Sequence, residues 1–159
     1  MRKKWNTHFI GAAVLLALAL ALLLVPQPAA SPLPQAATDD SVPAYHAKPP
    51  QGALPEIMNP ELFSDPVVQN AYAVAAKIKK TLYQQPCYCH CDRSQGHTSL
   101  LDCFASRHGS GCGTCIYEDL YSYEQARKGK SAAQIREGII KGEWQKVDAT
   151  KYQQPLAEK

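Results

Sequence analysis

The sequence predicts an all-α fold: a small cysteine-rich domain of about four helices, preceded by an N-terminal signal or anchor segment and a disordered linker. Three observations support this prediction. Apolar residues recur at helical spacing in segments that begin at helix-capping residues, and no segment alternates between apolar and polar residues as a strand would. All six cysteines lie between residues 87 and 115, so a small domain around them has its stabilising chemistry in one place.

The first 30 residues predict export from the cytoplasm. Arg2, Lys3 and Lys4 precede an uncharged apolar run over residues 9–25, which is the pattern of a secretory signal peptide or a membrane anchor. Positive charges before an apolar run keep the amino end in the cytoplasm, so we expect the rest of the chain in the periplasm or on the outer face of the cytoplasmic membrane. If the leader is not cleaved, residues 9–25 are the expected contact with the membrane.

The chain after the leader divides into a linker, a domain and a tail. Residues 31–58 are rich in Pro and Ala and contain few large apolar residues, which predicts a flexible linker. We expect the helical domain over residues 59–148 and a tail over residues 149–159. Three of the 17 Lys and Arg lie in the leader, and the others balance the 14 Asp and Glu. The part beyond the leader is therefore neutral, which argues against a nucleic-acid partner.

The first helix is predicted over residues 66–83. Asp65 is a good N-cap and Pro66 suits the first helical position, while Pro86 is expected to stop the helix. Its apolar residues recur at helical spacing: Val68, Tyr72, Ala75, Ile78 and Leu82. A second, short helix is predicted from Ser99, with Asp102 as the partner in a capping box. The Gly- and Ser-rich run over residues 108–111 ends it.

Two further helices follow in the second half of the domain. The third is predicted from Cys112 or Gly113 to Lys128, with Gly129 as its C-terminal stop. The fourth is predicted over residues 131–142, because Ser131 and Gln134 form a capping box. Its inward-facing residues are expected to be Ile135, Ile139 and Ile140, with Trp144 and Val147 packing at its edge.

The spacing of the cysteines favours a metal site. Cys87, Cys89 and Cys91 alternate, so in an extended or looped backbone their side chains point to one side. Cys112 and Cys115 lie where a helix is predicted to begin, and a helix N-terminus favours the thiolate. Thiolates suit zinc, and thiolate-rich sites suit copper(I). The predicted metal ligands are Cys87, Cys89, Cys91, His97, Cys103, Cys112 and Cys115.

The histidines differ in their expected roles. His97 is included among the ligands because it follows a glycine and begins a helix close to the cysteine run. His90 points away from its cysteine neighbours if the run is extended. His108 lies in a Gly- and Ser-rich loop and is expected to face solvent, as is His46 in the linker.

Two other interpretations of the cysteines remain open. Six cysteines in a small exported domain ordinarily form three disulfides. Bridges between positions two apart are strained, so Cys87, Cys89 and Cys91 would each need a partner among the other three cysteines. Alternatively, Cys112 and Cys115 form a C-x-x-C pair at a helix start, as in thiol-disulfide redox proteins, although no strand is predicted before them.

Several motifs run along this part of the chain: Pro86-Cys87-Tyr88-Cys89-His90-Cys91, Gly96-His97, residues 99–104, Cys112-x-x-Cys115 and residues 133–136. Together they resemble the bacterial PCYCGC-motif family over about residues 66–147. That family consists of exported or lipid-anchored proteins whose domain has no known function. The sequence departs from the motif at His90, where the motif has glycine. The resemblance implies a cysteine-rich domain of the cell envelope and supplies no activity.

Taken together, these observations predict a domain that binds a soft metal ion, copper or zinc. The expected partner is the metal ion itself, with another envelope protein as a candidate for hand-over. A closed all-thiolate site leaves no open position for water, so capture, buffering or hand-over of the metal is favoured over an enzymatic role.

Overall fold

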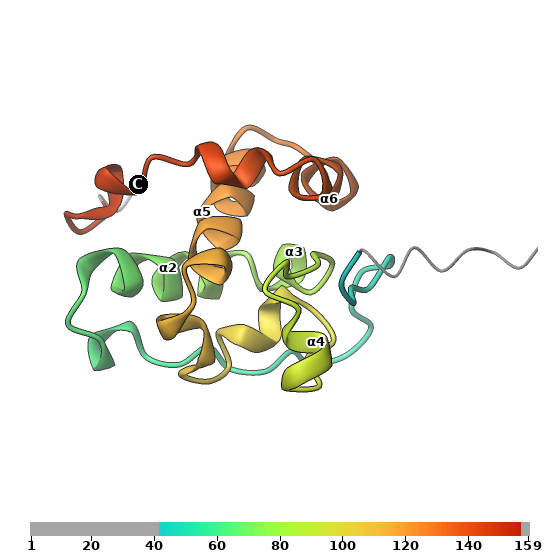
Figure 1. Ribbon diagram of the computed structural model, residues 1–159, viewed down its shortest axis with the longest axis horizontal. Coiled ribbons are helices and arrows are strands. Elements are labelled where there is room, and N and C mark those ends of the chain that lie inside the picture. The colour runs from blue at the N-terminus through green and yellow to red at the C-terminus, as the bar shows by residue number, and fades with distance from the viewer. Residues whose placement is uncertain (1–41, 157–159) are drawn as a thin grey trace, which may run out of the picture. The chain divides into compact units, whose positions relative to one another are not determined.

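The computed structural model describes residues 42–156 and arranges them around a central helix, α5 (Gly113–Arg127) (Figure 1). The helices α2 (Pro66–Lys77), α3 (Lys79–Leu82) and α6 (Ala132–Ile140) all contact α5. Residues 42–156 contain no strand, so the all-α prediction is confirmed. The predicted leader and the linker up to residue 41 lie outside the described residues. None of the described helices has the length and apolar character needed to cross a membrane.

Short elements connect these helices and pack against them. One is a four-residue helix, α4 (Cys91–Ser94), which follows the cysteine run. The others are 3-10 helices: η1 (Pro60–Leu62), η2 (Leu100–Cys103), η3 (His108–Gly111), η4 (Glu143–Lys146) and η5 (Ala149–Tyr152).

The first predicted helix is correct in its start and wrong in its continuity. Asp65 caps α2 by accepting a hydrogen bond from the backbone N–H of Val67 at 2.8 Å. At Ile78 the backbone leaves the helical region, with φ −120° and ψ 27°, and its N–H is shared between the carbonyls of Val74 and Ala75. Shared bonds of this kind are common at helix ends. The break starts α3 as a separate helix, which contacts both η2 and α5.

The second predicted helix is the single 3-10 turn η2. Its predicted cap is also wrong, because Ser99 makes no side-chain capping bond. Instead the backbone N–H and the hydroxyl of Thr98 both donate to Asp102 Oδ2, at 2.7 and 2.9 Å. A 3-10 turn suits this place because it carries Leu100, Leu101 and Cys103 into the core within one short segment.

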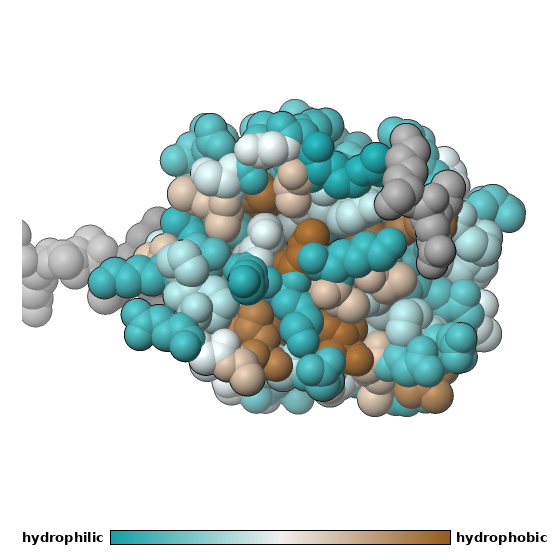
Figure 2. Space-filling view, turned by 180° about the vertical axis from the view of Figure 1, so that it is seen from behind, coloured by the Kyte–Doolittle hydropathy of each residue, from teal (hydrophilic) through white to brown (hydrophobic). Residues whose placement is uncertain are grey.

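The third and fourth predicted helices are confirmed as α5 and α6. Ser131 and Gln134 form the predicted capping box at the start of α6. Ile135 and Ile139 are buried as predicted, whereas Ile140 is 43% exposed and its inward assignment is wrong. Trp144 and Val147 pack at the edge of the small core that α6 forms with Tyr121. Figure 2 shows that apolar side chains reach the visible face only in small patches between hydrophilic ones.

Residues 42–58 have no helix and lie against the helical part, although the sequence predicts a flexible linker there. Leu54, Ile57 and Met58 pack against the main core. The ring of His46 stacks on that of Tyr83 with their centroids 3.9 Å apart, so the expectation that His46 is fully solvated is wrong. These contacts depend on residues far along the chain, and no local pattern in the Pro-rich segment indicates them.

Candidate metal centre

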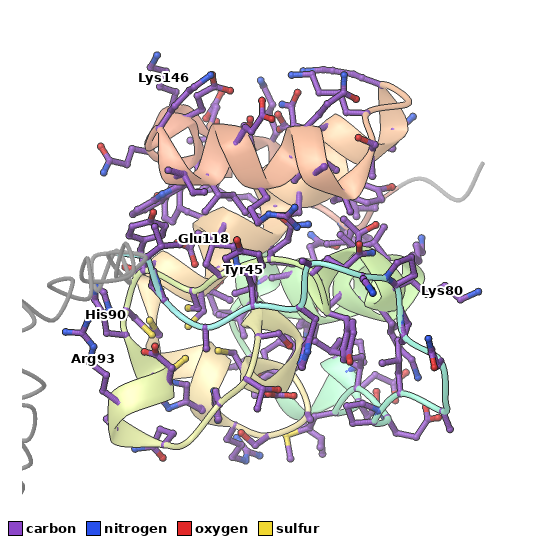
Figure 3. The ribbon with its side chains drawn as sticks, turned by 90° about the vertical axis from the view of Figure 1, so that its right-hand side faces the viewer. Tyr45, Lys80, His90, Arg93, Glu118 and Lys146 are labelled. Carbon is purple, nitrogen blue, oxygen red and sulfur yellow. The ribbon has the colours of Figure 1, made fainter. Side chains whose placement is uncertain are left out.

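The six cysteines come from four short segments and meet at the N-terminal end of α5. The Sγ atom of Cys87 lies 3.4 Å from that of Cys89 and 3.5 Å from that of Cys115, and Cys89 lies 3.6 Å from Cys115. Beside this triangle, the Sγ atoms of Cys91 and Cys103 are 3.4 Å apart. Cys112 caps α5 by accepting a hydrogen bond from the backbone N–H of Cys115 at 3.5 Å. Figure 3 shows the sulfur atoms gathered between Glu118 and His90.

A tight turn, and not an extended strand, brings Cys87, Cys89 and Cys91 together. The backbone N–H of His90 donates to the carbonyl of Cys87 at 3.0 Å, and His90 itself is left-handed, with φ 55°. Immediately after it, α4 begins at Cys91. Of the two backbone forms expected for this run, extended or looped, the looped one is present, and the cysteine side chains converge as predicted. A left-handed residue with a Cβ is sparsely populated, and such strain is typical of functional sites.

Four overlapping groups of side chains have ligand atoms within 4.8 Å of one another. The groups are Cys91, His97, Cys103 and His108; Cys87, Cys89 and Cys91; Cys87, Cys103 and Cys115; and Cys89, Cys112 and Cys115. The structure thus brings together all seven residues that the sequence predicts as metal ligands. It adds His108, which the sequence analysis places in solvent.

His108 is half-buried beside His97, and their rings meet edge to face with centroids 5.0 Å apart. His97 Nδ1 lies 3.3 Å from Cys103 Sγ. The solvent-facing expectation for His108 is wrong because η3 folds the Gly- and Ser-rich run back toward η2, where Gly109 sits close enough that a Cβ would be 2.9 Å from the carbonyl oxygen of Cys103. The only available signal was the position of His108 between Cys103 and Cys112 in the sequence.

The sulfur–sulfur distances fit free thiols and are close to those of a metal site. A disulfide bond is about 2.05 Å long. No two cysteines among the described residues are that close, and all six are free. Around a tetrahedral zinc ion, zinc–sulfur bonds of about 2.3 Å place the sulfurs about 3.8 Å apart. The observed 3.4–3.6 Å separations need to widen by only a few tenths of an ångström to admit an ion.

Hydrogen bonds within the cluster divide the thiols into acceptors and donors. Hydrogen bonds from neighbouring thiols, with that from Cys103 the strongest, lower the pKa of Cys115 to about 3. The pKa of Cys91 is lowered by Cys103 in the same way, and the pKa of Cys89 by Cys87. Hydrogen bonding within the cluster thus favours the thiolate form of these three sulfurs.

The remaining three thiols keep their protons. Hydrogen bonding within the cluster raises the pKa of Cys87 and of Cys103 above the ordinary range, because these thiols are the donors. Burial raises the pKa of Cys112 to about 12. On the other side of the triangle, the Cys89 thiolate raises the pKa of His108. The cluster therefore combines thiols of lowered and raised pKa at the start of a helix.

Two carboxyl groups on α5 lie behind the thiols. Glu118 is buried and accepts a hydrogen bond from the backbone N–H of Tyr88 at 2.9 Å, which fixes the turn of the cysteine run to α5. Burial raises the pKa of Glu118 and of Asp119 well above the usual carboxyl range. Burial therefore favours the protonated, uncharged form of both carboxyl groups.

Access to the cluster differs among its members. Cys87, Cys91, Cys103 and Cys115 are at most 3% exposed, whereas Cys89 and Cys112 are half-buried. Pro43 and Ala44 lie over Cys87 and Cys91 and line a narrow crevice there. The two less buried cysteines belong to the same ligand group, so this group is the part of the cluster that is most accessible to an ion.

A comparison with protein families identifies the family of this chain. A family model described as a protein of unknown function with PCYCGC motif matches residues 50–156. No curated protein and no solved structure matches the chain significantly. The family motif has glycine where this chain has His90, and the left-handed backbone at that position explains the glycine, since glycine adopts it without strain.

Proposed function

The chain belongs to the PCYCGC family of proteins of unknown function, and from this premise and the geometry of its thiols we propose that it binds a soft metal ion, copper or zinc. We place it outside the cytoplasm, in the cell envelope, where it captures, buffers or hands over the ion and does not catalyse a reaction. The proposed ligands are the six cysteines with His97 and His108.

The observation that carries this proposal is the convergence of eight metal-binding side chains on one small volume. Sulfur and imidazole nitrogen are the ligands that zinc and copper(I) favour. Four of the six cysteines are buried, none forms a disulfide, and hydrogen bonds favour the thiolate forms of Cys89, Cys91 and Cys115, whose negative charges are costly to bury without a cation. A bound cation neutralises them and takes the place of the shared protons.

Two features support capture and hand-over. Cys89 and Cys112 are half-exposed, so an ion can exchange ligands with a donor or acceptor protein at these two sulfurs. The leader in residues 1–30 supports export, because a basic start and an apolar run are the pattern of a secretory signal or anchor. An envelope protein that exchanges thiol or imidazole ligands is the matching partner.

The thiol-redox alternative is less well supported by the geometry. A redox-active C-x-x-C motif needs an accessible thiolate of low pKa. Cys115, whose pKa is lowered, is completely buried, and Cys112, which is more accessible, has a pKa raised by burial to about 12. Both cysteines also belong to the group around Cys89. A role as metal ligands fits the positions of both sulfurs, because it requires neither an exposed thiolate nor a low pKa at Cys112.

The test is a metal and thiol analysis of the full chain, purified from the cell envelope in detergent without chelator. We expect copper or zinc bound to the protein and six thiols that react only after denaturation. Because ligands must be deprotonated, metal binding must release protons and weaken as pH falls. A strong chelator should lower the melting temperature, whereas a mild reductant should leave it unchanged.

The opposite pattern decides against the proposal. Six oxidised cysteines, no bound metal and a melting temperature that falls with reductant would identify a disulfide scaffold, whose native bridges typically contribute about 2–5 kcal/mol in a small domain. Reversible oxidation of Cys112 and Cys115 alone, with the other four thiols free and no metal bound, would identify the redox protein.

A further inference from the structure

The four ligand groups are connected in a regular way. Five of the six cysteines each belong to two groups, so their sulfurs lie within reach of two ions at once. The shared residues are Cys87, Cys89, Cys91, Cys103 and Cys115. Of the six ways to pair four groups, five share one cysteine and none shares two.

This connectivity is that of a cage of metal ions bridged by thiolates. In a cage of four copper(I) ions and six thiolates, each ion has three sulfurs and each pair of ions shares one sulfur. Here three of the groups are trios of cysteines, and each member of a trio also belongs to another group except Cys112. The connectivity of these groups therefore differs from that of the ideal cage in one bridge alone.

The two histidines belong to one of the two groups that lack a shared sulfur. The group of Cys91 and Cys103 and the group of Cys89 and Cys112 share no residue. The first is completed by His97 and His108, with His97 Nδ1 at 3.3 Å from Cys103 Sγ, and the second by the sulfur of Cys112. At the first of these groups, imidazole nitrogen therefore takes the place of the sixth sulfur, and it binds one ion without bridging to a second.

The coordination numbers separate copper(I) from zinc. A structural zinc site is almost always tetrahedral, with four ligands. Among the described residues, only the group that contains His97 and His108 offers four ligand atoms within mutual reach, while the other three groups offer three each. Three thiolates suit copper(I), which is soft and accepts three-coordinate geometry. One zinc ion could use the histidine group, but it would leave the Cys87, Cys89 and Cys115 triangle empty.

We infer that the cluster takes up four copper(I) ions as one thiolate-bridged cage, an inference that rests on the proposed metal-binding function and specifies its cargo. Five cysteines bridge pairs of ions, Cys112 is an end ligand at one ion, and the histidines are end ligands at the ion beside Cys91 and Cys103. Each thiol that still carries a proton releases it to solvent as copper binds. No electron is transferred, because copper arrives as copper(I).

The test is a titration of the full chain, reduced and metal-free under anaerobic conditions, with copper(I) supplied as its acetonitrile complex against a competing chromogenic copper(I) chelator. Native mass spectrometry counts the bound ions, and X-ray absorption detects copper–copper scattering. We expect four ions per chain, few intermediates between the empty and the four-ion species, and a copper–copper signal. Zinc titrated in parallel should reach one ion per chain.

Variants then test which sulfurs are shared. Replacing a shared sulfur, as in Cys87→Ser, should lower the copper count by about two, because two groups lose a ligand. Cys112→Ser leaves two cysteines in its one group and should lower the count by about one, whereas His108→Ala leaves Cys91, His97 and Cys103 in the four-membered group and should keep four ions. His46→Ala is the matched control for a histidine outside the four groups and should keep four ions.

The outcomes separate this inference from the proposed function. One or two copper ions per chain without copper–copper scattering overturns the cage and leaves the metal-binding proposal in place. Equal losses of copper in Cys87→Ser and Cys112→Ser also overturn the assignment of shared sulfurs. A reduced wild-type chain that binds neither copper(I) nor zinc overturns both proposals.

Discussion

The two ends of α5 are held in place by different chemistry. At the N-terminal end the helix meets thiols, and its first turns contribute Cys115 and the buried Glu118. At the C-terminal end it meets α6 and η4, where Tyr121 packs against Ile135 and Ile139, both at most 1% exposed (Figure 1). One end is a cluster of ionisable sulfurs, and the other is an apolar core.

This difference indicates which end of α5 can depend on a bound ligand for its stability. The apolar end buries hydrocarbon surface, which stabilises it without any ion. Its polar groups are also paired, since the Tyr121 hydroxyl donates to Glu143 Oε2 at 2.6 Å. The thiol end instead gathers ionisable sulfurs, and each thiolate formed there repels its thiolate neighbours unless a cation binds. We therefore expect metal to add stability to a helical frame that folds without it.

The largest expected effect is at the apolar end. Ile139→Ala should lower the free energy of unfolding by about 2–5 kcal/mol, because it leaves a cavity in a packed core. The loss should be the same in metal-free and metal-loaded protein, as measured by urea unfolding with and without copper. Ile140→Ala is the matched control: the neighbouring residue is 43% exposed, and a surface substitution typically costs within about 0.5 kcal/mol.

If Ile139→Ala abolished metal binding at temperatures far below its unfolding transition, the two ends would be coupled. The comparison would then fail, because α5 would transmit packing at α6 to the thiols.

The contrast between Ile139 and Ile140 also shows what sequence can predict. The caps of α2 and α6 are local signals, and Asp65, Pro66, Ser131 and Gln134 act as their sequence positions indicate. Ile140 follows the same apolar pattern as Ile139, but α6 ends there, so its orientation depends on the turn into η4. Periodicity alone does not define a face at a helix end.

The candidate site was predictable in its membership and not in its shape. Six cysteines in one short segment predict that their sulfurs converge, and they do. Two details depend on backbone conformation that sequence does not reveal: the left-handed His90, which turns the run, and η3, which brings His108 to the thiols. Both arise in short turns, where propensity is weak and long-range contacts decide the conformation.

The second largest effect is expected at the thiol end and only with metal present. Metal at about 1,000 times its dissociation constant stabilises a folded protein by about 4 kcal/mol. Cys115→Ser and Cys89→Ser should each remove most of this gain, because both sulfurs belong to the Cys87 triangle. Thermal unfolding with and without copper measures the difference. Equal destabilisation in metal-free protein would show that these sulfurs act through packing instead.

A third effect, at the thiol end, is a pH dependence of stability that differs between metal-free and metal-loaded protein. Asp119 is fully buried, neither of its carboxylate oxygens has a hydrogen-bond partner among the described residues, and burial raises its pKa. Above about pH 4 the carboxyl is ionised in the unfolded chain but protonated in the folded one. The folded state then binds more protons, so stability falls as pH rises from about 4 toward the raised pKa, by up to about 1.4 kcal/mol per pH unit.

Metal binding has the opposite dependence, since it requires thiolates and strengthens as pH rises. Metal-free protein should thus lose stability between pH 5 and pH 8, while protein with copper should lose less or gain. Asp119→Asn should flatten the metal-free curve, as measured by urea unfolding at both pH values. An unchanged slope in Asp119→Asn would assign the pH dependence to other groups, with Glu118 the first to examine because burial raises its pKa too.

The smallest expected effect compares the N-caps of the two helices that meet at these ends. Ser131 caps α6 within a capping box, and Ser131→Ala should cost about 1 kcal/mol with or without metal. Cys112 caps α5 through a weaker acceptor, a sulfur 3.5 Å from the Cys115 N–H. Serine is among the best N-caps, so Cys112→Ser should stabilise metal-free protein by at most about 1 kcal/mol while it removes a metal ligand.

The opposite signs make Cys112→Ser informative despite its small size. If the only role of the Cys112 sulfur were to cap α5, serine would raise the stability of the protein and the stabilisation by copper would be unchanged. A sulfur retained for metal should give a variant that unfolds at higher urea concentration without copper and gains less stability when copper is added. Urea unfolding of wild type and Cys112→Ser, each with and without copper, measures both the metal-free stability and the gain in stability on adding copper. A variant with the same copper-dependent gain as wild type would remove Cys112 from the site and leave it as the cap of α5.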